Sequence, residues 1–453
     1  MAAPLMKSVS GIRGIVGESL DPDLVVRVAS AFARYVKRGR VVVGRDSRPT
    51  GETIAQCLVS VLVLAGCDVV DIGVVPTPTV QLMVEELSAA GGIVISASHN
   101  PIEWNAFKLI GSTGSFLNQK EINRFFAMMD APGLYMRWDK VGTLARHGGA
   151  GGMHIDRALA VIDAEKVRAA SFNVALDSVN GAGSVITPEL LKKLGCGVVP
   201  VHCIVDGTFP RGAEPVPANL GDLSAAVKKH GCDIGFAQDP DADRLAIVDE
   251  RGRPIGEENT IALVVKHLLG KETGRVVVNL STTKTVEEIA RQYGAPFTRT
   301  KVGEIHVADE MRRRGARIGG EGNGGVISPE VHLGRDSLAG IVYVLEMMAE
   351  TGKSVSQLVA ELPSFFMIKG KTKISGKSAG KAFTAKLRKS FKGEKFSEID
   401  GVRIDFVRHE EFRGGWVHLR PSNTEPIFRI IAEGVDEAQA GKIYSHFEKM
   451  IRT

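Results

Sequence analysis

The sequence predicts an α/β protein of several domains, and three observations support this fold class. The chain has 453 residues, which is too many for one hydrophobic core. A β-rich run, a polar turn, an amphipathic helical stretch that ends near glycine and a second β-rich run recur at residues 40–75, 172–205 and 274–303. The units lie roughly a hundred residues apart, which is too far for a solenoid and indicates domains. We therefore expect three similar α/β domains with mixed, mostly parallel sheets.

The last part of the chain has a different pattern. After a basic stretch that starts near Ile368, apolar and polar residues alternate on both sides of a Gly-Gly turn in VRIDFVRHEEFRGGWVHLRPS, residues 402–422. This alternation predicts antiparallel strands, so we expect a smaller C-terminal α+β domain. The Gly148–Gly152 cluster is predicted to be a linker. The predicted domains are residues 1–153, 154–255, 256–367 and 368–453.

Composition indicates a cytoplasmic protein without a membrane or nucleic-acid partner. No apolar run approaches the roughly 20 residues of a membrane helix, and Met1–Met6 lacks the parts of a secretory signal. The five cysteines form no C-x-x-C pair, which favours reduced thiols. Residues 369–395 carry ten lysines and arginines and one acid, Glu394. Because the only aromatics there are Phe383 and Phe391, a solvated helix face is favoured over a nucleic-acid patch.

Residues 92–111 carry the first candidate for chemistry. The apolar run Ile93–Ile95 predicts a buried strand, which ends in a small polar turn that presents Ser98. His99, Asn100 and Pro101 stop the strand, and Lys108 follows. A hydroxyl at a strand end, beside an imidazole and an amine, suits group transfer through a covalent intermediate. A purely structural turn also uses serine and asparagine, so the other motifs must decide.

The Ser-Ala-Ser-His-Asn-Pro run, with Asn105 and Lys108 behind it, resembles the phosphoserine loop of the α-D-phosphohexomutases. That family includes phosphoglucomutases, phosphomannomutases and phosphoglucosamine mutases. The resemblance implies that Ser98 carries a phosphoryl group, donates it to a sugar phosphate and recovers it from the other end. It also implies three further motifs downstream, in a fixed order, with the domains arranged around a central cleft.

The second motif is an acidic loop that contains Asp239, Asp241 and Asp243. Three carboxylates at alternate positions repel one another unless the loop turns around a hard cation, so a bound metal is the economical explanation. An EF-hand calcium loop would place Glu250 at its twelfth position, but its sixth position needs glycine and is occupied by Arg244. The segment resembles the family's magnesium loop, which implies that the three aspartates and a phosphoserine oxygen hold Mg²⁺. Arg244 is then implied as a phosphate contact.

The third motif is the glycine-rich segment Gly319–Gly325. It resembles the family's sugar-binding loop, which implies that Glu321 holds sugar hydroxyls. Many members have serine where this chain has Asn323 and histidine where it has Gly325. Asparagine can still bond a hydroxyl, whereas glycine has no side chain to do so. His332 or Lys108 are candidates to take the place of the missing histidine.

The fourth motif is Arg420–Pro426, with Arg429 following. The planar fork of arginine matches phosphate, and hydroxyls and loop amides add donors, although a surface turn with a structural salt bridge is the alternative. The segment resembles the family's phosphate-binding loop, with Asn423 in place of the usual glycine. The resemblance implies that the phosphate that does not react is held by Arg420, Ser422, Asn423, Thr424 and Arg429.

Two shorter segments complete a resemblance that spans the chain. Ser10–Gly14 resembles the family's N-terminal loop, whose arginine, here Arg13, lies near the phosphoserine. Lys301-Val302-Gly303 resembles a substrate-contacting loop, which makes Lys301 a substrate-binding candidate. Catalysis would then rest on positioning and charge stabilisation by Mg²⁺ and the arginines, with His99 beside the serine. Lys108 is the candidate for moving the hydroxyl proton, because a buried lysine near cations has a lowered pKa.

The resemblance therefore implies reversible phosphoryl transfer between C6 and C1 of a hexose phosphate. The implied cofactors are Mg²⁺ and a hexose 1,6-bisphosphate activator, and the implied partner is the sugar phosphate alone, with the chain a monomer or homodimer. The length and the Gly-Asn-Gly-Gly loop resemble the phosphoglucosamine mutase branch, so glucosamine 6-phosphate is the favoured substrate. Glucose and mannose phosphates are the alternatives.

Two rival functions remain at this point. A metal-dependent phosphatase would use the same serine and aspartates, but it need not hold a distal phosphate. A non-catalytic phosphosugar-binding protein is the second rival, and the intact Ser98, aspartates and Lys108 argue against it.

Overall fold

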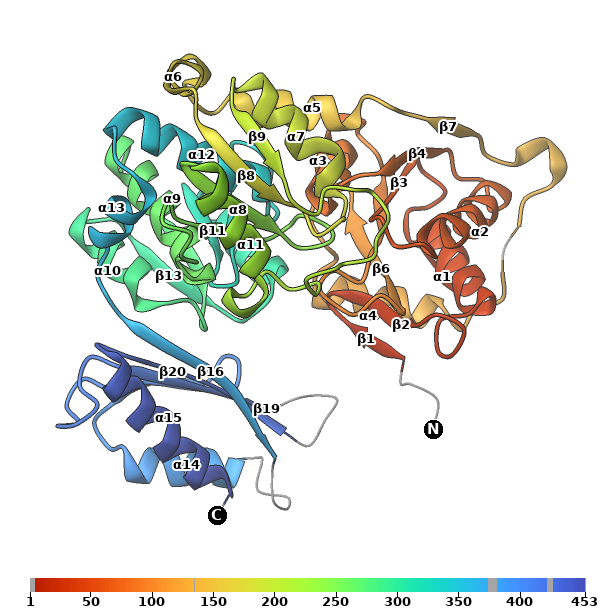
Figure 1. The fold of residues 1–453 in the computed structure, drawn as a ribbon. Coiled ribbons are helices and arrows are strands. Elements are labelled where there is room, and N and C mark those ends of the chain that lie inside the picture. Colours follow the sequence, from red (N-terminus) through yellow and green to blue (C-terminus); the bar gives the residue numbers. More distant parts are fainter. Residues whose placement is uncertain (1–4, 134, 374–380, 422–426, 453) are drawn as a thin grey trace.

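We analysed a computed structural model of the chain, which describes residues 5–133, 135–373, 381–421 and 427–452. Three α/β domains lie together, and Figure 1 shows the C-terminal domain, in blue, set apart below them. Each domain is built on one mixed or antiparallel sheet. The fold class predicted from the sequence is confirmed. Within the described ranges, no helix combines the length and the apolar character needed to cross a membrane.

The first domain contains a seven-stranded sheet covered on both faces. In spatial order its strands are β1 (Met6–Ser8), β2 (Gly11–Ile15), β6 (Trp104–Gly111), β5 (Gly91–Ile95), β3 (Val41–Arg45), β4 (Val69–Val74) and β7 (Leu144–Arg146). Its helices are α1 (Pro22–Tyr35), α2 (Gly51–Leu64), α3 (Thr77–Glu86) and α4 (Gln119–Met128). Successive side chains of a strand point to opposite faces, so Val41 and Val43 pack with α1, α2 and α4 while Val42 packs with α3. Asp21 starts α1 by accepting a hydrogen bond from Leu24 N at 2.8 Å.

The second and third domains have four-stranded sheets with the same arrangement. The strand orders are β11 (Leu245–Val248), β10 (Ile234–Gln238), β8 (Asn173–Asp177), β9 (Gly197–Pro200), and β13 (Phe297–Thr300), β12 (Val276–Asn279), β14 (Ile318–Glu321), β15 (Gly325–Ile327). The helices that follow are α5 (Ala150–Leu159), α6 (Ala164–Ala170), α7 (Gly183–Lys193), α8 (Gly221–His230), α9 (Glu257–Lys271), α10 (Lys284–Gln292), α11 (Glu304–Arg314), α12 (Ser337–Thr351) and α13 (Val355–Ala360). The two domains share one hydrophobic core that runs from Ile155 to Leu362.

The C-terminal domain is a five-stranded antiparallel sheet with two helices on one side. Its strand order is β16 (Phe366–Lys373), β20 (Ile427–Gly434), β19 (Trp416–Pro421), β18 (Val402–Asp405) and β17 (Lys395–Ser397), and its helices are α14 (Lys381–Ser390) and α15 (Glu437–Arg452). The domain has its own core, formed by residues between Phe383 and Ile451. In α14, Leu387 is buried while Arg388 and Lys389 are exposed, as a solvated basic helix face predicts.

Two details of the domain junctions differ from simple expectation. The Gly148–Gly152 cluster does not form a free linker, because α5 begins at Ala150 and its face with His154 and Ile155 is buried. The predicted boundary at 153/154 therefore falls inside α5, and the one at 367/368 falls inside β16. The predicted boundaries of the four domains remain predictions.

Each α/β domain carries its candidate loop at the same topological position. In all three sheets a central strand that pairs in parallel with one neighbour turns back into an antiparallel strand on its other side: β5 into β6, β10 into β11, and β14 into β15. The serine, aspartate and glutamate motifs predicted from the sequence occupy these turns. The antiparallel partner explains why the sheets are mixed rather than fully parallel, and it brings the three loops toward a common centre.

Candidate active site

Ser98 lies at the turn between β5 and β6, where a buried network fixes its backbone. The backbone φ of Ser98 is 47°, in the left-handed region. Ser98 N donates to Ser96 Oγ at 3.0 Å, and Ser96 Oγ donates to Asp46 Oδ2 at 2.6 Å. Arg48 Nη2 donates to the carbonyls of Ser98 and Asn100, each at 2.7 Å. The serine is thus held in one position by side chains from the loop after the neighbouring strand β3.

The structure brings Ser98 to the acidic loop of the second domain. Ser98 Oγ donates to Asp239 Oδ2 at 2.7 Å, although the residues are 141 positions apart. Asp239, Asp241 and Asp243 are fully buried, and their ligand atoms lie within 4.8 Å of one another. The loop turns through Ala242, whose φ is 51°, and Asp239 Oδ1 accepts from the Arg244 amide at 3.1 Å. The convergence predicted from the alternating aspartates is therefore present.

The residues of this loop fit a hard divalent cation. Among the described residues, Asp241 Oδ1 and Asp243 Oδ1 are buried and accept no hydrogen bond. Burial, and then the neighbouring Asp243 and Asp241, raise the pKa of Asp239 well above its usual range. Buried carboxylate oxygens without a hydrogen bond are costly, and oxygen ligands in such a cluster are those that Mg²⁺ prefers.

Lys108, on β6, points at the same carboxylates. Its Nζ contacts Asp241 Oδ2 and lies 3.5 Å from Asp243 Oδ2, while Thr77 Oγ1 also donates to Asp241. Burial disfavours the ammonium, but Asp241 and Asp243 outweigh burial and raise the pKa of Lys108 above its usual value. The expected lowering of this pKa is therefore wrong, because the effect of the two carboxylates exceeds the opposing effects of burial and of Arg335.

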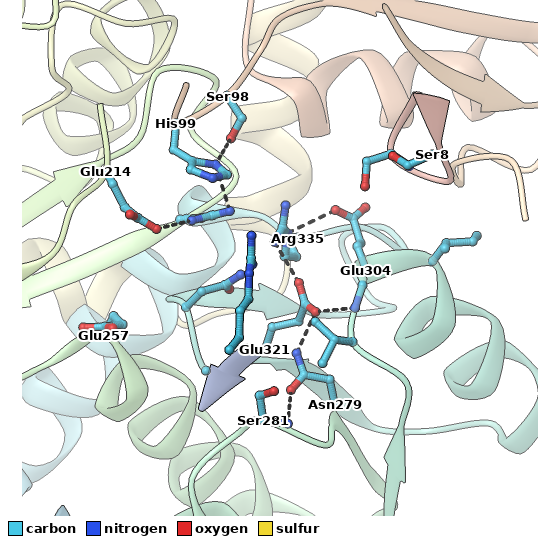
Figure 2. Close-up of a pocket in the computed structure, with 18 of the residues that line it drawn as sticks. Ser8, Ser98, His99, Glu214, Glu257, Asn279, Ser281, Glu304, Glu321 and Arg335 are labelled. Carbon is cyan, nitrogen blue, oxygen red and sulfur yellow. Dashed lines mark hydrogen bonds and ion pairs between the residues drawn. The ribbon is translucent and has the colours of Figure 1, made fainter. Parts of the chain in front are cut away.

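Cationic side chains surround the open side of Ser98. His99 Nδ1 accepts from Arg244 Nη2 at 3.1 Å and lies 3.5 Å from Ser98 Oγ. Arg244, followed by burial, lowers the pKa of His99 well below its usual value, so the imidazole is neutral and can accept this bond. Arg13 Nη1 donates to Asn100 Oδ1, and Arg244 Nη1 pairs with Glu214 at 3.0 Å. Arg13 and Arg244 thus line the cavity on the side of Ser98 and His99, and Figure 2 shows His99 beside Ser98.

Glu321 is the predicted sugar-binding residue that the third domain contributes to the site. It lies at the end of β14 and is 2% exposed. Its Oε1 accepts from Asn279 Nδ2 at 2.7 Å and from Gly303 N at 2.9 Å, as Figure 2 shows for Asn279. Burial alone would raise the pKa of Glu321, but the charge of Arg335 and the hydrogen bonds from Asn279 and Gly303 N together lower it. Asn323 Oδ1 accepts from Gly325 N at 3.2 Å, which leaves its amide nitrogen available for a ligand.

The C-terminal domain supplies the opposite wall. Arg420 on β19 and Arg429 on β20 are direct cross-strand partners. Like charges directly opposite one another are unfavourable, and a bound anion would offset this repulsion. Asp400 Oδ2 pairs with Arg420 Nε at 3.0 Å. The other predicted residues of this loop, Ser422, Asn423 and Thr424, lie outside the described residues.

A cavity of about 700 Å³ connects these groups. Its lining comes from all four domains and includes Arg13, Ser98, Lys108, Arg244, Glu321, Asn323, Arg420 and Arg429. Lys301 is exposed and is not part of the lining, where its neighbours Val302 and Gly303 are found instead. His332 is buried with its Nε2 3.5 Å from Asp336 Oδ2, so it does not stand in for a histidine at position 325.

Comparison with known families matches all four domains in order. The matches are to phosphoglucomutase/phosphomannomutase α/β/α domain I at residues 5–134, domain II at 153–252, domain III at 257–366 and the C-terminal domain at 367–449. The chain belongs to the phosphoglucomutase/phosphomannomutase family. Its members use Mg²⁺, and the aspartate cluster of this chain has the composition that such a site requires.

Individual relatives of this phosphoglucomutase/phosphomannomutase family member cover nearly its whole length. A "Phosphoglucomutase/phosphomannomutase" of Thermococcus kodakarensis is 39% identical over 95% of this chain and 94% of the relative. A "Probable phosphoglucosamine mutase" of Methanopyrus kandleri is 35% identical over 98% and 97%. Among solved structures, a "putative phosphomannomutase" from Thermus thermophilus has a TM-score of 0.84 at 26% identity and covers 100% of both chains. A family protein from Burkholderia thailandensis has a TM-score of 0.83 at 27% identity, covering 98% and 97%.

Several site residues were not predicted from the sequence. Asp46 and Arg48 hold the Ser98 loop, Asn279 holds Glu321, and Arg335 reaches two of the loops. The one available signal was position in the sequence, because Asp46–Arg48 directly follows strand β3, as the Ser98 turn directly follows β5. Parallel strands end at the same edge of a sheet, so polar residues after β3 and β5 lie side by side.

Proposed function

We propose that this enzyme interconverts the 6-phosphate and 1-phosphate of a hexose through phospho-Ser98 and a bisphosphorylated sugar. The observation that carries the proposal is the buried contact between Ser98 Oγ and the aspartate cluster, at 2.7 Å, on one side of a cleft whose other side carries Arg420 and Arg429. A serine that transfers phosphoryl groups needs compensation for anionic charge at its own end, and a mutase also needs a grip on the second phosphate.

The chain's own residues divide the work in the following way. Ser98 Oγ carries the phosphoryl group, gives it to the free hydroxyl of the sugar phosphate, and accepts the other phosphoryl after the bisphosphate has turned. Arg244 and Arg13 face the transferring group. Lys108 Nζ is assigned to the proton of the attacking hydroxyl, since a cation on the aspartates would offset the carboxylate charge that raises the pKa of Lys108. A divalent cation held by Asp239, Asp241 and Asp243 would supply compensation for the charge on that group.

The remaining residues orient the substrate. Glu321 and Asn323 are assigned to sugar hydroxyls, and His99 fixes the Arg244 guanidinium through its neutral Nδ1. Arg420 and Arg429, with Ser422, Asn423 and Thr424, are assigned to the phosphate that does not react. Lys301 would reach a ligand only from the rim of the cleft, since it does not line the cavity.

We favour glucosamine 6-phosphate as the substrate. The support is the Gly-Asn-Gly-Gly loop at 322–325 and the name of the Methanopyrus relative. The relative of higher identity from Thermococcus favours a second candidate, a dual phosphoglucomutase and phosphomannomutase. A hexose 1,6-bisphosphate activator, a cytoplasmic location and a monomeric or homodimeric state belong to the same proposal.

The deciding experiment is an isomerisation assay with Mg²⁺ and a trace of hexose 1,6-bisphosphate. The 6-phosphates of glucosamine, glucose and mannose are compared by kcat/KM, with Ser98→Ala as the control. A strong preference for glucosamine 6-phosphate is expected. Better turnover of glucose or mannose 6-phosphate would move the assignment to the dual mutase. Release of inorganic phosphate without isomerisation would indicate a phosphatase instead, and binding without turnover by phosphorylated enzyme would indicate a binding protein.

A further inference from the structure

One buried guanidinium lies between the metal loop and the sugar loop. Arg335 precedes α12, and its Nη2 donates to Asp243 Oδ2 at 2.6 Å while its Nη1 donates to Glu321 Oε2 at 2.7 Å. Its Nε donates to Glu304 Oε2 at 3.2 Å, and Figure 2 shows the ion pairs with Glu304 and Glu321. The side chain is 11% exposed at the wall of the cleft. All three guanidinium nitrogens of Arg335 therefore donate to acids, and these acids come from two domains.

The backbone around Arg335 leaves the side chain little freedom. The residue is bridged to Ile327 of β15, and the next residue, Asp336, donates its amide to Val326 O at 2.8 Å and caps α12. On the other side the guanidinium stem runs over Gly325, where an added Cβ would lie 2.3 Å from Arg335 Cδ. Glycine at position 325 is thus what makes room for this arginine, and Arg335 occupies the space that a side chain at position 325 would need.

In two of the acids that Arg335 contacts, Asp243 and Glu321, the second carboxylate oxygen has a different set of neighbours. Asp243 Oδ1 accepts no hydrogen bond among the described residues, and its one ion pair there, with Arg244 Nε at 3.8 Å, is long enough to leave it open to a cation. Glu321 Oε1 is held by Asn279 and Gly303 N. Hydrogen bonds to the outer oxygens of ligating carboxylates orient those ligands, and losing such a bond costs metal affinity. A planar fork can hold two carboxylates at fixed separation, which a single ammonium cannot do.

We propose that Arg335 is a positioning residue that sets Asp243 of the metal loop and Glu321 of the sugar loop relative to each other. Removing its guanidinium weakens divalent-cation binding and sugar-phosphate binding together, although Arg335 is assigned to neither ligand. The sugar arm rests on the proposed function, whereas the metal arm depends only on the aspartate cluster.

The test measures Mn²⁺ binding by the electron paramagnetic resonance signal of the free ion, without any sugar, and glucosamine 6-phosphate binding by calorimetry. For Arg335→Gln we expect the Mn²⁺ Kd to rise about 10- to 100-fold. We expect the sugar-phosphate Kd to rise about 10-fold. Arg335→Lys should restore at most one of the two Kd values, that of Mn²⁺ or that of the sugar phosphate, because one ammonium cannot contact both carboxylates. The matched control is Arg317→Gln, which removes a partly buried third-domain arginine paired with Glu330 outside the cleft.

A second variant guards against loss of folding. Gly325→Ala keeps every charge but pushes against Arg335 Cδ, so both Kd values should rise in the same direction by a smaller factor. Gly152→Ala is its control, because no atom lies within 4 Å of a Cβ built there. If both Arg335→Gln and Gly325→Ala bind Mn²⁺ as the parent protein does, the inference is wrong while the mutase proposal stands. If the parent binds no sugar phosphate, the proposed function fails while the Mn²⁺ arm still decides the role of Arg335.

Discussion

The two ends of the cleft are built in opposite ways. The reacting end, around Ser98 and the aspartates, is built from buried side chains that come from all three α/β domains, including Lys108, Arg244 and Arg335. The distal end, around Arg420 and Arg429, belongs to a domain with a separate core. That domain meets the third domain through polar contacts, such as those of Asp400 with Val302 N and of Glu433 with Lys284 N, at 3.0 and 2.8 Å.

This difference matches what each end must do in the proposed cycle. Transfer at the serine depends on fixed geometry and on charges that need no reorganisation. The distal end must instead release a bisphosphate, let it turn, and grip the other phosphate. A few polar contacts between domains can break at low cost, because water replaces the lost hydrogen bonds. The comparison predicts that changes at the reacting end affect the chemical step, whereas changes at the distal end affect binding and domain docking.

The largest expected effect is at the serine. Ser98→Ala should lower kcat by at least about 10³-fold, because the phosphoryl carrier is lost. The metal-free protein should melt only slightly lower, since the hydrogen bond to Asp239 is lost while Arg48 and Ser96 still hold the backbone of the turn. The two quantities are followed by the isomerisation assay and by calorimetric melting. If Ser98→Ala retained its turnover, the covalent mechanism through phospho-Ser98 would be ruled out.

The second prediction is that one substitution in the metal loop lowers activity and raises stability. Asp239→Asn should abolish Mg²⁺-dependent turnover and yet raise the melting temperature of the metal-free protein by a few degrees. The reason is that burial and two neighbouring carboxylates raise the pKa of Asp239 above that of the unfolded chain, so ionisation of this residue destabilises the folded protein. Asparagine Oδ1 can still accept from the Arg244 amide. The control is Asp222→Asn, an exposed carboxylate of α8. A lower melting temperature for Asp239→Asn than for the parent would contradict the charge argument.

The third prediction concerns the distal arginines. Arg420→Gln should raise KM about 10- to 100-fold while kcat falls far less, because one charge-assisted bond to the held phosphate is lost. Stability should change little, since the substitution loses the ion pair with Asp400 but also relieves repulsion with the cross-strand partner Arg429. Arg388→Gln in the same domain, which removes an exposed ion pair with Glu398, serves as the control. A fall in kcat equal to the fall in kcat/KM would mean that Arg420 acts in the chemical step.

The same contrast decides what the sequence could reveal. Ser98, the three aspartates and Glu321 were predictable because each lies in a short polar run at a strand end, and the repeated βαβ pattern gave the fold class. Arg335 and Arg48 were not predictable, because they act through acids or carbonyls that are far away in sequence, such as Asp243, 92 positions from Arg335. Gly325 illustrates the limit: its sequence showed only that a side chain was missing, whereas the structure shows which side chain fills the space.

The smallest expected effect is a pH dependence of domain docking through His418. His418 Nε2 bonds the Asp400 carbonyl at 2.6 Å, and its Nδ1 lies 3.0 Å from Ser281 Oγ of the third domain. Burial lowers the pKa of His418 to about 4, from 6.5 when it is exposed. The unfolded chain therefore binds more protons between these values, so the stabilisation is complete above pH 6.5 and is lost as the pH falls toward 4.

The expected loss of unfolding free energy between pH 7.5 and 5.5 is roughly 1 kcal/mol. Denaturant unfolding and hydrogen exchange of β18 and β19 over this pH range measure it. His418→Gln, which keeps a donor and an acceptor but cannot titrate, should flatten the difference. Because other groups titrate in the same window, the quantity that decides is the difference between the two proteins at each pH. If the variant and the parent lose stability in parallel, His418 does not control docking, and the polar contacts of Asp400 and Glu433 must hold the domain alone.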